Sequence, residues 1–119
     1  MAKEQSIIQN KSFDFALSVI KLYKQLVTQN EYVLSKQLLR SGTSIGANVE
    51  EASAGQTKKD FIAKMSIASK EARETLYWLK LLQESNLTSI DCSFQLKQCL
   101  EVVNILTAIV KTSQQNQNL

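Results

Sequence analysis

The sequence predicts an all-α fold, an antiparallel up-down-up-down four-helix bundle. Its 119 residues suit one domain, and they include no proline and only three glycines, so helices can run long. Apolar residues recur with the helical period in four segments, and no alternating strand pattern competes with them. Hydrophobic residues make up 44% of the chain, enough to close one core without disulfides or metal.

The first helix is expected from about Ser12 to Thr28, and it carries two apolar stripes. One stripe contains Phe15, Val19, Leu22 and Leu26. The other contains Phe13, Leu17, Ile20 and Val27. Together they form an apolar arc wider than one bundle core requires, and the surplus apolar face predicts burial against another subunit.

The second helix is expected from about Tyr32 to Ala54, and it contains two glycines. Gly42 and Gly46 each cost about 1 kcal/mol relative to alanine in a helix interior. We therefore expect the close approach of a neighbouring helix, or a local bend, to offset this cost. Gly55 follows at the position of a C-cap glycine.

The third and fourth helices complete the predicted bundle. Thr57 is the expected N-cap of the third helix, which reaches about Ser85. The fourth helix is expected from Ser89 or Asp91 to about Thr112. The short connections predict antiparallel neighbours. The expected organisation is a flexible N-terminus over residues 1–11, a bundle domain over 12–112 and a disordered polar tail over 113–119.

Composition excludes several classes of function. The chain has no histidine, which excludes histidine-based catalytic triads and histidine-containing metal sites. The net charge of +3 permits a polyanionic partner without requiring one. Neither a membrane span nor a signal-peptide core is evident, so a cytoplasmic protein is expected. Cys92 and Cys99 lie about 10 Å apart on a helix, beyond disulfide reach, and we expect buried thiols.

Glutamates on the second and third helices raise the possibility of a di-iron site. A bundle of that kind also needs Glu-x-x-His motifs, which a chain without histidine cannot supply. The alternative is that these glutamates pair with nearby cations or face solvent. We therefore expect no metal and no cofactor. The glutamates concerned are Glu50, Glu51, Glu71 and Glu74.

A polar line follows one face of the second helix, at spacings of four, four and three residues. It consists of Arg40, Ser44, Asn48 and Glu51. The line could form a small polar pocket, or a hydrogen-bonded strip that fixes helix register or contacts another subunit. The strip is favoured, because no nucleophile lies beside a base. No catalytic residue is predicted, and the protein is expected not to be an enzyme.

A basic stripe follows the third helix over about 30 Å. Its functional members are Lys59, Lys70, Arg73, Tyr77 and Lys80. The cations could contact phosphates while Tyr77 stacks on a base. The alternative for a lone stripe on a monomer is a solvated face, whereas an oligomer would repeat the stripe and make it multivalent. The neighbouring Trp78 fits either a core position or an interface anchor.

One run of residues resembles a known family. Residues 39–52 read LRSGTSIGANVEEA, and Phe61, Ile67-Ala68, Glu71 and Glu74 follow. This pattern is similar to that of the ribosomal intervening-sequence proteins, four-helix bundles encoded in insertions within large-subunit ribosomal RNA genes of some bacteria. The match is close over about residues 38–82. It departs from the family where Gly46 replaces a frequent proline and Ala52 replaces a glycine.

The resemblance implies a ring-like homo-oligomer, a pentamer, with no established enzymatic activity. Related accessory proteins of diversity-generating retroelements form similar rings that associate with a reverse transcriptase and nucleic acid. Two hypotheses follow for this chain. The first is a homo-oligomer that binds RNA or DNA through its basic stripe. The second is an assembly scaffold or adaptor with no nucleic-acid role, in which the polar line, with Glu71 and Glu74, organises contacts within or between subunits.

Overall fold

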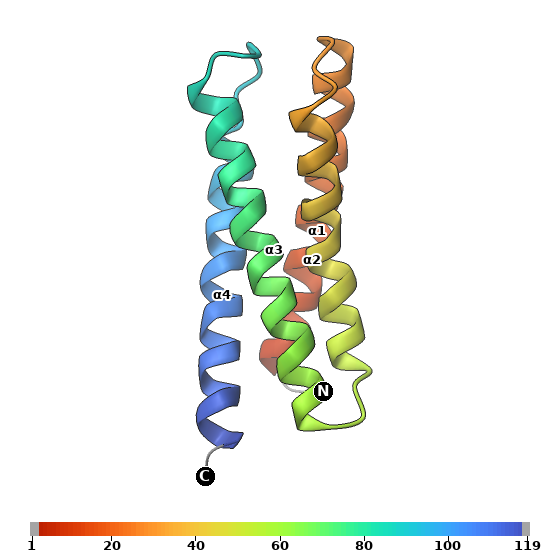
Figure 1. Cartoon of the computed structure of the whole chain (residues 1–119), viewed down its shortest axis with the longest axis vertical. Coiled ribbons are helices and arrows are strands. Elements are labelled where there is room, and N and C mark those ends of the chain that lie inside the picture. Colours follow the sequence, from red (N-terminus) through yellow and green to blue (C-terminus); the bar gives the residue numbers. More distant parts are fainter. Residues whose placement is uncertain (1–2, 118–119) are drawn as a thin grey trace.

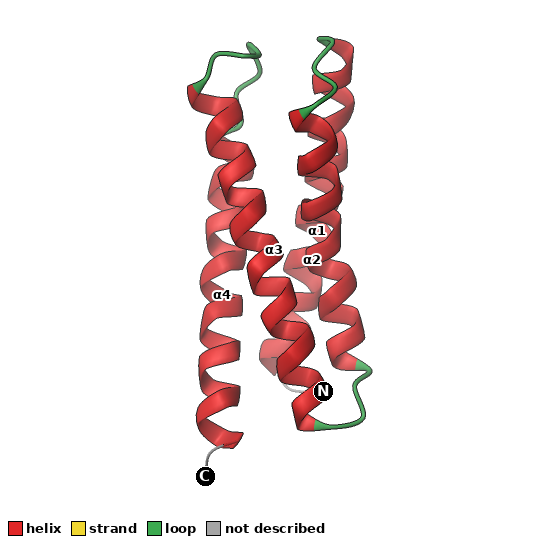
Figure 2. Cartoon of the chain, viewed as in Figure 1, coloured by secondary structure: helices red, strands yellow, loops and turns green. Residues whose placement is uncertain are grey.

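The computed structural model describes the backbone of residues 3–117 and the side chains of residues 7–116. It contains the helices α1 (Lys3–Thr28), α2 (Leu34–Ser53), α3 (Lys58–Glu84) and α4 (Ser93–Gln117). No strand is present within residues 3–117 (Figure 2). The prediction of an all-α protein with four helices is therefore confirmed.

The four helices lie along one rod of 50 × 21 × 21 Å. The α1–α2 and α3–α4 connections lie at one end of the rod, and the α2–α3 connection lies at the other (Figure 1). Each helix packs on its neighbours in chain order, and α4 closes the arrangement by packing on α1. Of these contacts, the one between α1 and α4 is the least extensive.

Both end helices are longer than predicted. Residues 3–11 belong to α1 and residues 113–117 belong to α4, although both segments were expected outside the bundle. Ile8 explains the first difference, because it is fully buried and extends the core beyond Ser12. The tail contains no proline or glycine, so its glutamines continue the helix. The remaining parts of both predicted termini, residues 1–2 and 118–119, lie outside the described residues.

Side chains at the helix ends define the turns. The Thr57 hydroxyl accepts a hydrogen bond from the Asp60 backbone N–H at 3.0 Å, which confirms Thr57 as the N-cap of α3. Asn30 ends α1 in the left-handed conformation, with a φ of 65°. The backbone N–H groups of Asn30 and Glu31 then bond to the carbonyls of Val27 and Leu26, as in a Schellman motif.

Gly55 does not have the conformation expected of a C-cap glycine. The α2 helix ends at Ser53, Ala54 is its C-cap, and none of the described glycines has a positive φ. The Gly55 N–H instead bonds to the Ala52 carbonyl at 3.1 Å. The polypeptide therefore leaves α2 without a left-handed residue, and Gly55 is not required there for its conformational freedom.

The core is built from one apolar stripe of each helix. Of the two stripes predicted for α1, the one that contains Phe15, Val19, Leu22 and Leu26 is buried. Cys92 and Cys99 are buried as well, and both thiols are free as expected. Burial raises the pKa of Cys99 to about 12, so this thiol stays protonated at neutral pH. Other fully buried side chains are Leu38, Ile45, Val49, Met65, Ala68, Ala72, Leu79, Leu82 and Leu106.

Gly42 marks the closest approach between α1 and α2. A Cβ atom at Gly42 would lie 2.9 Å from both γ carbons of Val19. The same addition at Gly46 would meet the Ser12 carbonyl oxygen at 3.5 Å, an ordinary contact. Gly42 thus confirms the expected close approach of a neighbouring helix, whereas nothing around Gly46 requires a glycine.

Candidate nucleic-acid interface

The polar line of α2 lies along the boundary with α3. Arg40 Nη1 donates to Glu71 Oε2 at 3.3 Å, and Arg40 Nη2 also pairs with Glu74 Oε2. Further along the same boundary, Lys64 Nζ lies 2.9 Å from Glu51 Oε1. Two members of the predicted line, together with both predicted glutamates of α3, therefore connect α2 to α3 within one subunit.

The middle of the polar line bonds to its own helix. The Ser44 hydroxyl donates to the Arg40 carbonyl at 2.7 Å, and the Asn48 amide donates to the Ser44 carbonyl at 2.9 Å. Both hydrogen bonds join residues of α2 that are four positions apart. These contacts support the interpretation of a hydrogen-bonded strip.

A buried hydroxyl pair adds to the α2–α3 boundary. Thr75 and Ser41 are both buried, and their hydroxyl oxygens lie 2.8 Å apart. Sequence reasoning missed this pair, because serine and threonine give no charge signal. Their spacing does place them on the core faces of their helices, at positions that neighbour Leu38 and Leu79.

Another missed residue is Glu31, which is buried at the start of α2. Its carboxylate accepts hydrogen bonds from the backbone N–H groups of Val33, Leu34 and Ser35, the last at 2.6 Å. A carboxylate at this position satisfies the unpaired amides and complements the helix dipole. An acidic residue shortly before an apolar helix was the available sequence signal.

The basic stripe of α3 lies on the outward face of the helix. Its five members are all exposed: Lys59, Lys70, Arg73, Tyr77 and Lys80. Arg73 also reaches α4, where its Nη2 donates to Thr107 Oγ1 at 2.8 Å. The two glutamates in the middle of α3 lie on the α2 side and pair with Arg40. The exposed acidic residues of α3 are Asp60 and Glu84, near the two ends of the stripe, so its middle from Lys70 to Lys80 presents the cations.

Tyr77 and Trp78 form an aromatic pair beside these cations. Their ring centroids are 5.3 Å apart, and the planes meet at 66° in an edge-to-face contact. The Trp78 indole N–H donates to Glu74 Oε2 at 3.0 Å, and the side chain packs against the core. Trp78 is therefore held within the subunit, whereas Tyr77 faces solvent.

The α1 stripe that contains Phe13, Leu17, Ile20 and Val27 is left largely exposed by its own bundle. Phe13, Leu17 and Ile20 retain 63%, 53% and 37% of their accessible surface, and Phe94 on α4 retains 64%. Large apolar side chains gathered in this way on one surface are typical of an interface. Val27, the fourth member of the predicted stripe, is half-buried.

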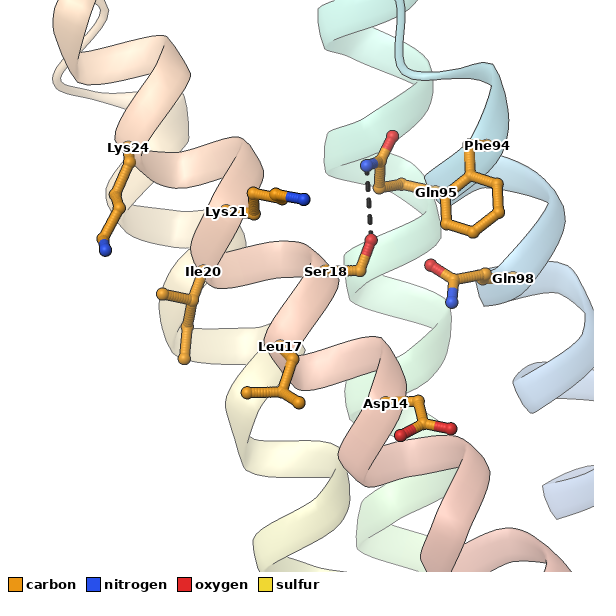
Figure 3. Close-up of a pocket in the computed structure, with 9 residues that line it drawn as sticks. All are labelled: Asp14, Leu17, Ser18, Ile20, Lys21, Lys24, Phe94, Gln95 and Gln98. Atoms are coloured by element: carbon orange, nitrogen blue, oxygen red, sulfur yellow. Dashed lines mark hydrogen bonds between the residues drawn. The ribbon is translucent and has the colours of Figure 1, made fainter.

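A groove of about 610 Å³ runs between α1 and α4 beside this stripe. In Figure 3, Gln95 and Gln98 extend from α4 towards Ser18 and Asp14 on α1. Gln95 Nε2 donates to Ser18 Oγ at 3.3 Å. The side-chain oxygens of both glutamines are buried without a hydrogen-bond partner among the described residues. The groove therefore combines apolar side chains with polar and charged ones from both helices.

Among the side chains that the structure describes, no three histidine, cysteine or carboxylate groups lie close enough together to hold a metal ion. Within residues 3–117, no helix has both the length and the apolar stretch needed to cross a membrane.

Comparisons with known proteins agree with this architecture. The family described as 23S rRNA-intervening sequence protein matches residues 4–108. A crystal structure of a protein of unknown function from the S23 ribosomal protein family of Bacteroides thetaiotaomicron has 44% sequence identity and a TM-score of 0.85. That match covers 91% of this chain and 98% of the other. The comparison with curated proteins gives no match. The family match spans all four helices, and this chain belongs to the 23S rRNA-intervening sequence protein family.

Proposed function

We propose that this protein is a non-enzymatic, cytoplasmic homo-oligomer that binds RNA or DNA through the outward face of α3. In this proposal the helices form an antiparallel up-down-up-down bundle, and copies of the bundle assemble into a ring-like pentamer. The observation that carries the proposal is the continuous exposure of Lys59, Lys70, Arg73 and Lys80 along one helix face.

The distribution of charge on α3 supports a polyanionic partner. Glu71 and Glu74 would oppose phosphate binding if they faced outward, but both pair with Arg40 on the side of α3 that faces α2. Neutralisation of a phosphate releases counterions, so lysine and arginine side chains in this arrangement favour nucleic acid at low salt. Binding of this kind tolerates sequence differences, because phosphates carry no base information.

The apolar stripe of α1 supports self-assembly. Phe13, Leu17 and Ile20 give α1 an apolar surface that its own bundle leaves exposed. Assembly would remove this surface from water. It would also repeat the α3 stripe in each subunit, so weak individual contacts would act together.

Light scattering of the purified protein, with the ratio of absorbance at 260 and 280 nm, tests both parts of the proposal. We expect a mass of several subunits and, after removal of copurified nucleic acid, binding of added RNA or DNA at low ionic strength. The four cations of one stripe predict a slope of log affinity against log salt of about −2.8 for a single strand. A monomeric mass would refute self-assembly, and absence of binding at low salt would refute the nucleic-acid role.

Charge reversal at Lys70 tests whether nucleic acid binds to the outward face of α3. Lys70→Glu should weaken binding and reduce the salt slope by about 0.7 or more. Lys36→Glu is the matched control, because Lys36 is an exposed lysine on α2 and the change in net charge is the same. Equal weakening by both variants would show a general effect of net charge and would contradict the assignment to α3.

A second candidate function is a scaffold or adaptor without a nucleic-acid role. The observation that favours it is the polar line, because its charged residues Arg40 and Glu51 form ion pairs with α3. On this hypothesis Asn48→Leu should change stability or oligomeric state without changing RNA binding. Normal assembly and stability of this variant would remove Asn48 from the organising role.

A further inference from the structure

The pair formed by Tyr77 and Trp78 on α3 combines an exposed ring with a fixed support. Tyr77 retains 56% of its accessible surface, although its ring contacts Trp78 at a centroid distance of 5.3 Å. An edge-to-face contact uses one side of an aromatic pair and leaves ring surface open. Tyr77 therefore offers an aromatic surface to a ligand from solvent.

Three interactions hold the supporting ring in place. Trp78 packs against the core, and its indole N–H donates to Glu74 Oε2 at 3.0 Å. Glu74 is in turn paired with Arg40 from the neighbouring helix. A ring that is oriented before binding loses less conformational freedom when a ligand stacks on it.

Cations lie on the same helix face on both sides of Tyr77. Arg73 lies four residues before it and Lys80 lies three residues after it, within about one helical turn in each direction. Lys70 continues the series one turn further towards the N-terminus of α3. An aromatic surface flanked by cations matches the two parts of a nucleotide, its base and its phosphates.

We propose that the outward face of α3 selects single-stranded nucleic acid, and that Tyr77 stacks on an unpaired base between phosphates bound by Arg73 and Lys80. Bases in a duplex are stacked on one another, so a ring on a helix surface reaches their faces only in single strands. Trp78, Glu74 and Arg40 act as positioning residues for Tyr77. This inference rests on the proposed nucleic-acid function and adds the class of ligand.

Four ligands of equal length separate stacking from charge: single-stranded oligo-dT, single-stranded oligo-U, an abasic deoxyribose-phosphate strand and a duplex. The full-length protein should bind both base-containing single strands more tightly than the abasic strand at the same salt concentration. Tyr77→Ala should weaken their binding about fivefold to a hundredfold. It should change binding of the abasic strand and the duplex by less than about twofold, because these ligands offer phosphates alone.

Tyr77→Phe is the matched control, because it keeps the ring and removes only the hydroxyl. Its affinity for oligo-dT and oligo-U should remain within about twofold of the unaltered protein, since stacking uses the ring face. Tyr77 lies on the surface, so both variants should keep the helical circular dichroism of the unaltered protein. Equal affinities for oligo-dT and oligo-U support stacking as the interaction that both strands share. If Tyr77→Ala does not weaken the binding of one of them, stacking on Tyr77 is refuted for that strand.

The fluorescence of Trp78 provides a second measurement, one that phosphate binding alone is not expected to change. Trp78 is the only tryptophan in the sequence, so its fluorescence reports directly on the aromatic pair. Oligo-dT should change Trp78 emission at saturation, and the abasic strand should not. Trp78→Phe removes the indole N–H and should lower the preference for oligo-dT over the abasic strand, while Tyr77 stays intact.

The outcomes distinguish this inference from the proposed function. If the abasic strand and the duplex bind as tightly as oligo-dT and Tyr77→Ala changes nothing, the selection of single strands is refuted and the charged interface stands. If none of the four ligands binds at low salt, the nucleic-acid function itself is refuted.

Discussion

Replacement of Gly42 by alanine should destabilise the protein, although alanine is the better helix former. A Cβ atom at this position would lie 2.9 Å from both γ carbons of Val19 and 3.3 Å from its Cβ. Val19 is fully buried and branched at Cβ, so it cannot turn away from the added methyl group without a change of rotamer. The helices α1 and α2 must therefore separate slightly, or Val19 must adopt a strained conformation.

The size of the effect follows from two opposing contributions. Alanine favours a helix interior over glycine by about 1 kcal/mol. An extra methyl group forced into a packed core costs about 1 to 3 kcal/mol. The net expectation is a loss of about 1 kcal/mol in the free energy of unfolding, which corresponds to a urea midpoint lower by about 0.5 M.

Gly46→Ala is the matched control in the same helix. Its new methyl group would meet the Ser12 carbonyl oxygen at 3.5 Å and so needs no rearrangement. Only the helix preference remains, and the variant should be more stable by up to about 1 kcal/mol. Urea unfolding followed by circular dichroism at one protein concentration compares the two variants, since self-assembly would make stability depend on concentration.

A second substitution identifies the cause. In a Val19→Ala background the methyl group at residue 42 has space, so Gly42→Ala should there be stabilising. The sign of its effect should thus reverse between the two backgrounds, with a coupling of at least about 0.5 kcal/mol. If Gly42→Ala stabilises the unaltered protein as much as Gly46→Ala does, the close contact with Val19 does not constrain the helix spacing.

Three further perturbations test other parts of the structure. Glu31→Ala leaves three backbone N–H groups of α2 without their acceptor and should cost about 2 to 3 kcal/mol in urea unfolding, whereas Glu101→Ala on the surface should cost under about 1 kcal/mol. A Glu31→Ala loss no larger than that of Glu101→Ala would contradict the capping role. Cys99 has a pKa of about 12 in the fold and an ordinary value of 9.0, so the unfolded chain releases its proton first as pH rises. Cys99 should therefore contribute a loss of about 1 kcal/mol between pH 8 and pH 10, and the stability of Cys99→Ala should fall less over that interval by this amount. Arg40→Met should cost under about 2 kcal/mol, with the loss shrinking at high salt, because its partners are partly exposed; a loss unaffected by salt would contradict an ionic role.

The fold was largely predictable because its signals are local and repeated. Helical periodicity identified the two apolar stripes of α1, although not which of them is buried, and the spacing of Thr57 and Asp60 identified the start of α3. The ends of the chain were less predictable. Of the adjacent pair Ile7 and Ile8 only Ile8 joins the core, and two consecutive apolar residues followed by polar ones do not establish a helical period.

The turns show which information the sequence pattern lacks. Asn30 and Asn86 have positive φ values after α1 and α3, whereas Gly55 after α2 does not. Glycine is the usual residue for this conformation, and asparagine tolerates it less often, so a rule based on glycine selected the wrong helix end. Whether a helix end needs a left-handed residue depends on the path of the connection to the next helix. The sequence of a single segment does not specify that path.

The candidate site was predictable as faces of helices but not as contacts. The spacing of Lys59, Lys70 and Lys80 placed them together on one surface, and the structure shows them exposed there. The spacing of the polar line did not reveal which helix it faces. The pairing of Arg40 with Glu71 and Glu74 depends on the rotation and register of α2 against α3, which are tertiary quantities.

The order in which the helices pack has a consequence for folding. Three of the four helix contacts join segments adjacent in the chain, so they close short loops, and bundles of this kind fold in about microseconds to milliseconds. The contact between α1 and α4 joins the two extremes of the chain and has the largest closure entropy to overcome. It also contains the groove, where Gln95 and Gln98 replace apolar packing. We expect this seam to form last and to open first, so a partner that spans α1 and α4 would hold the bundle closed as well as bind to it.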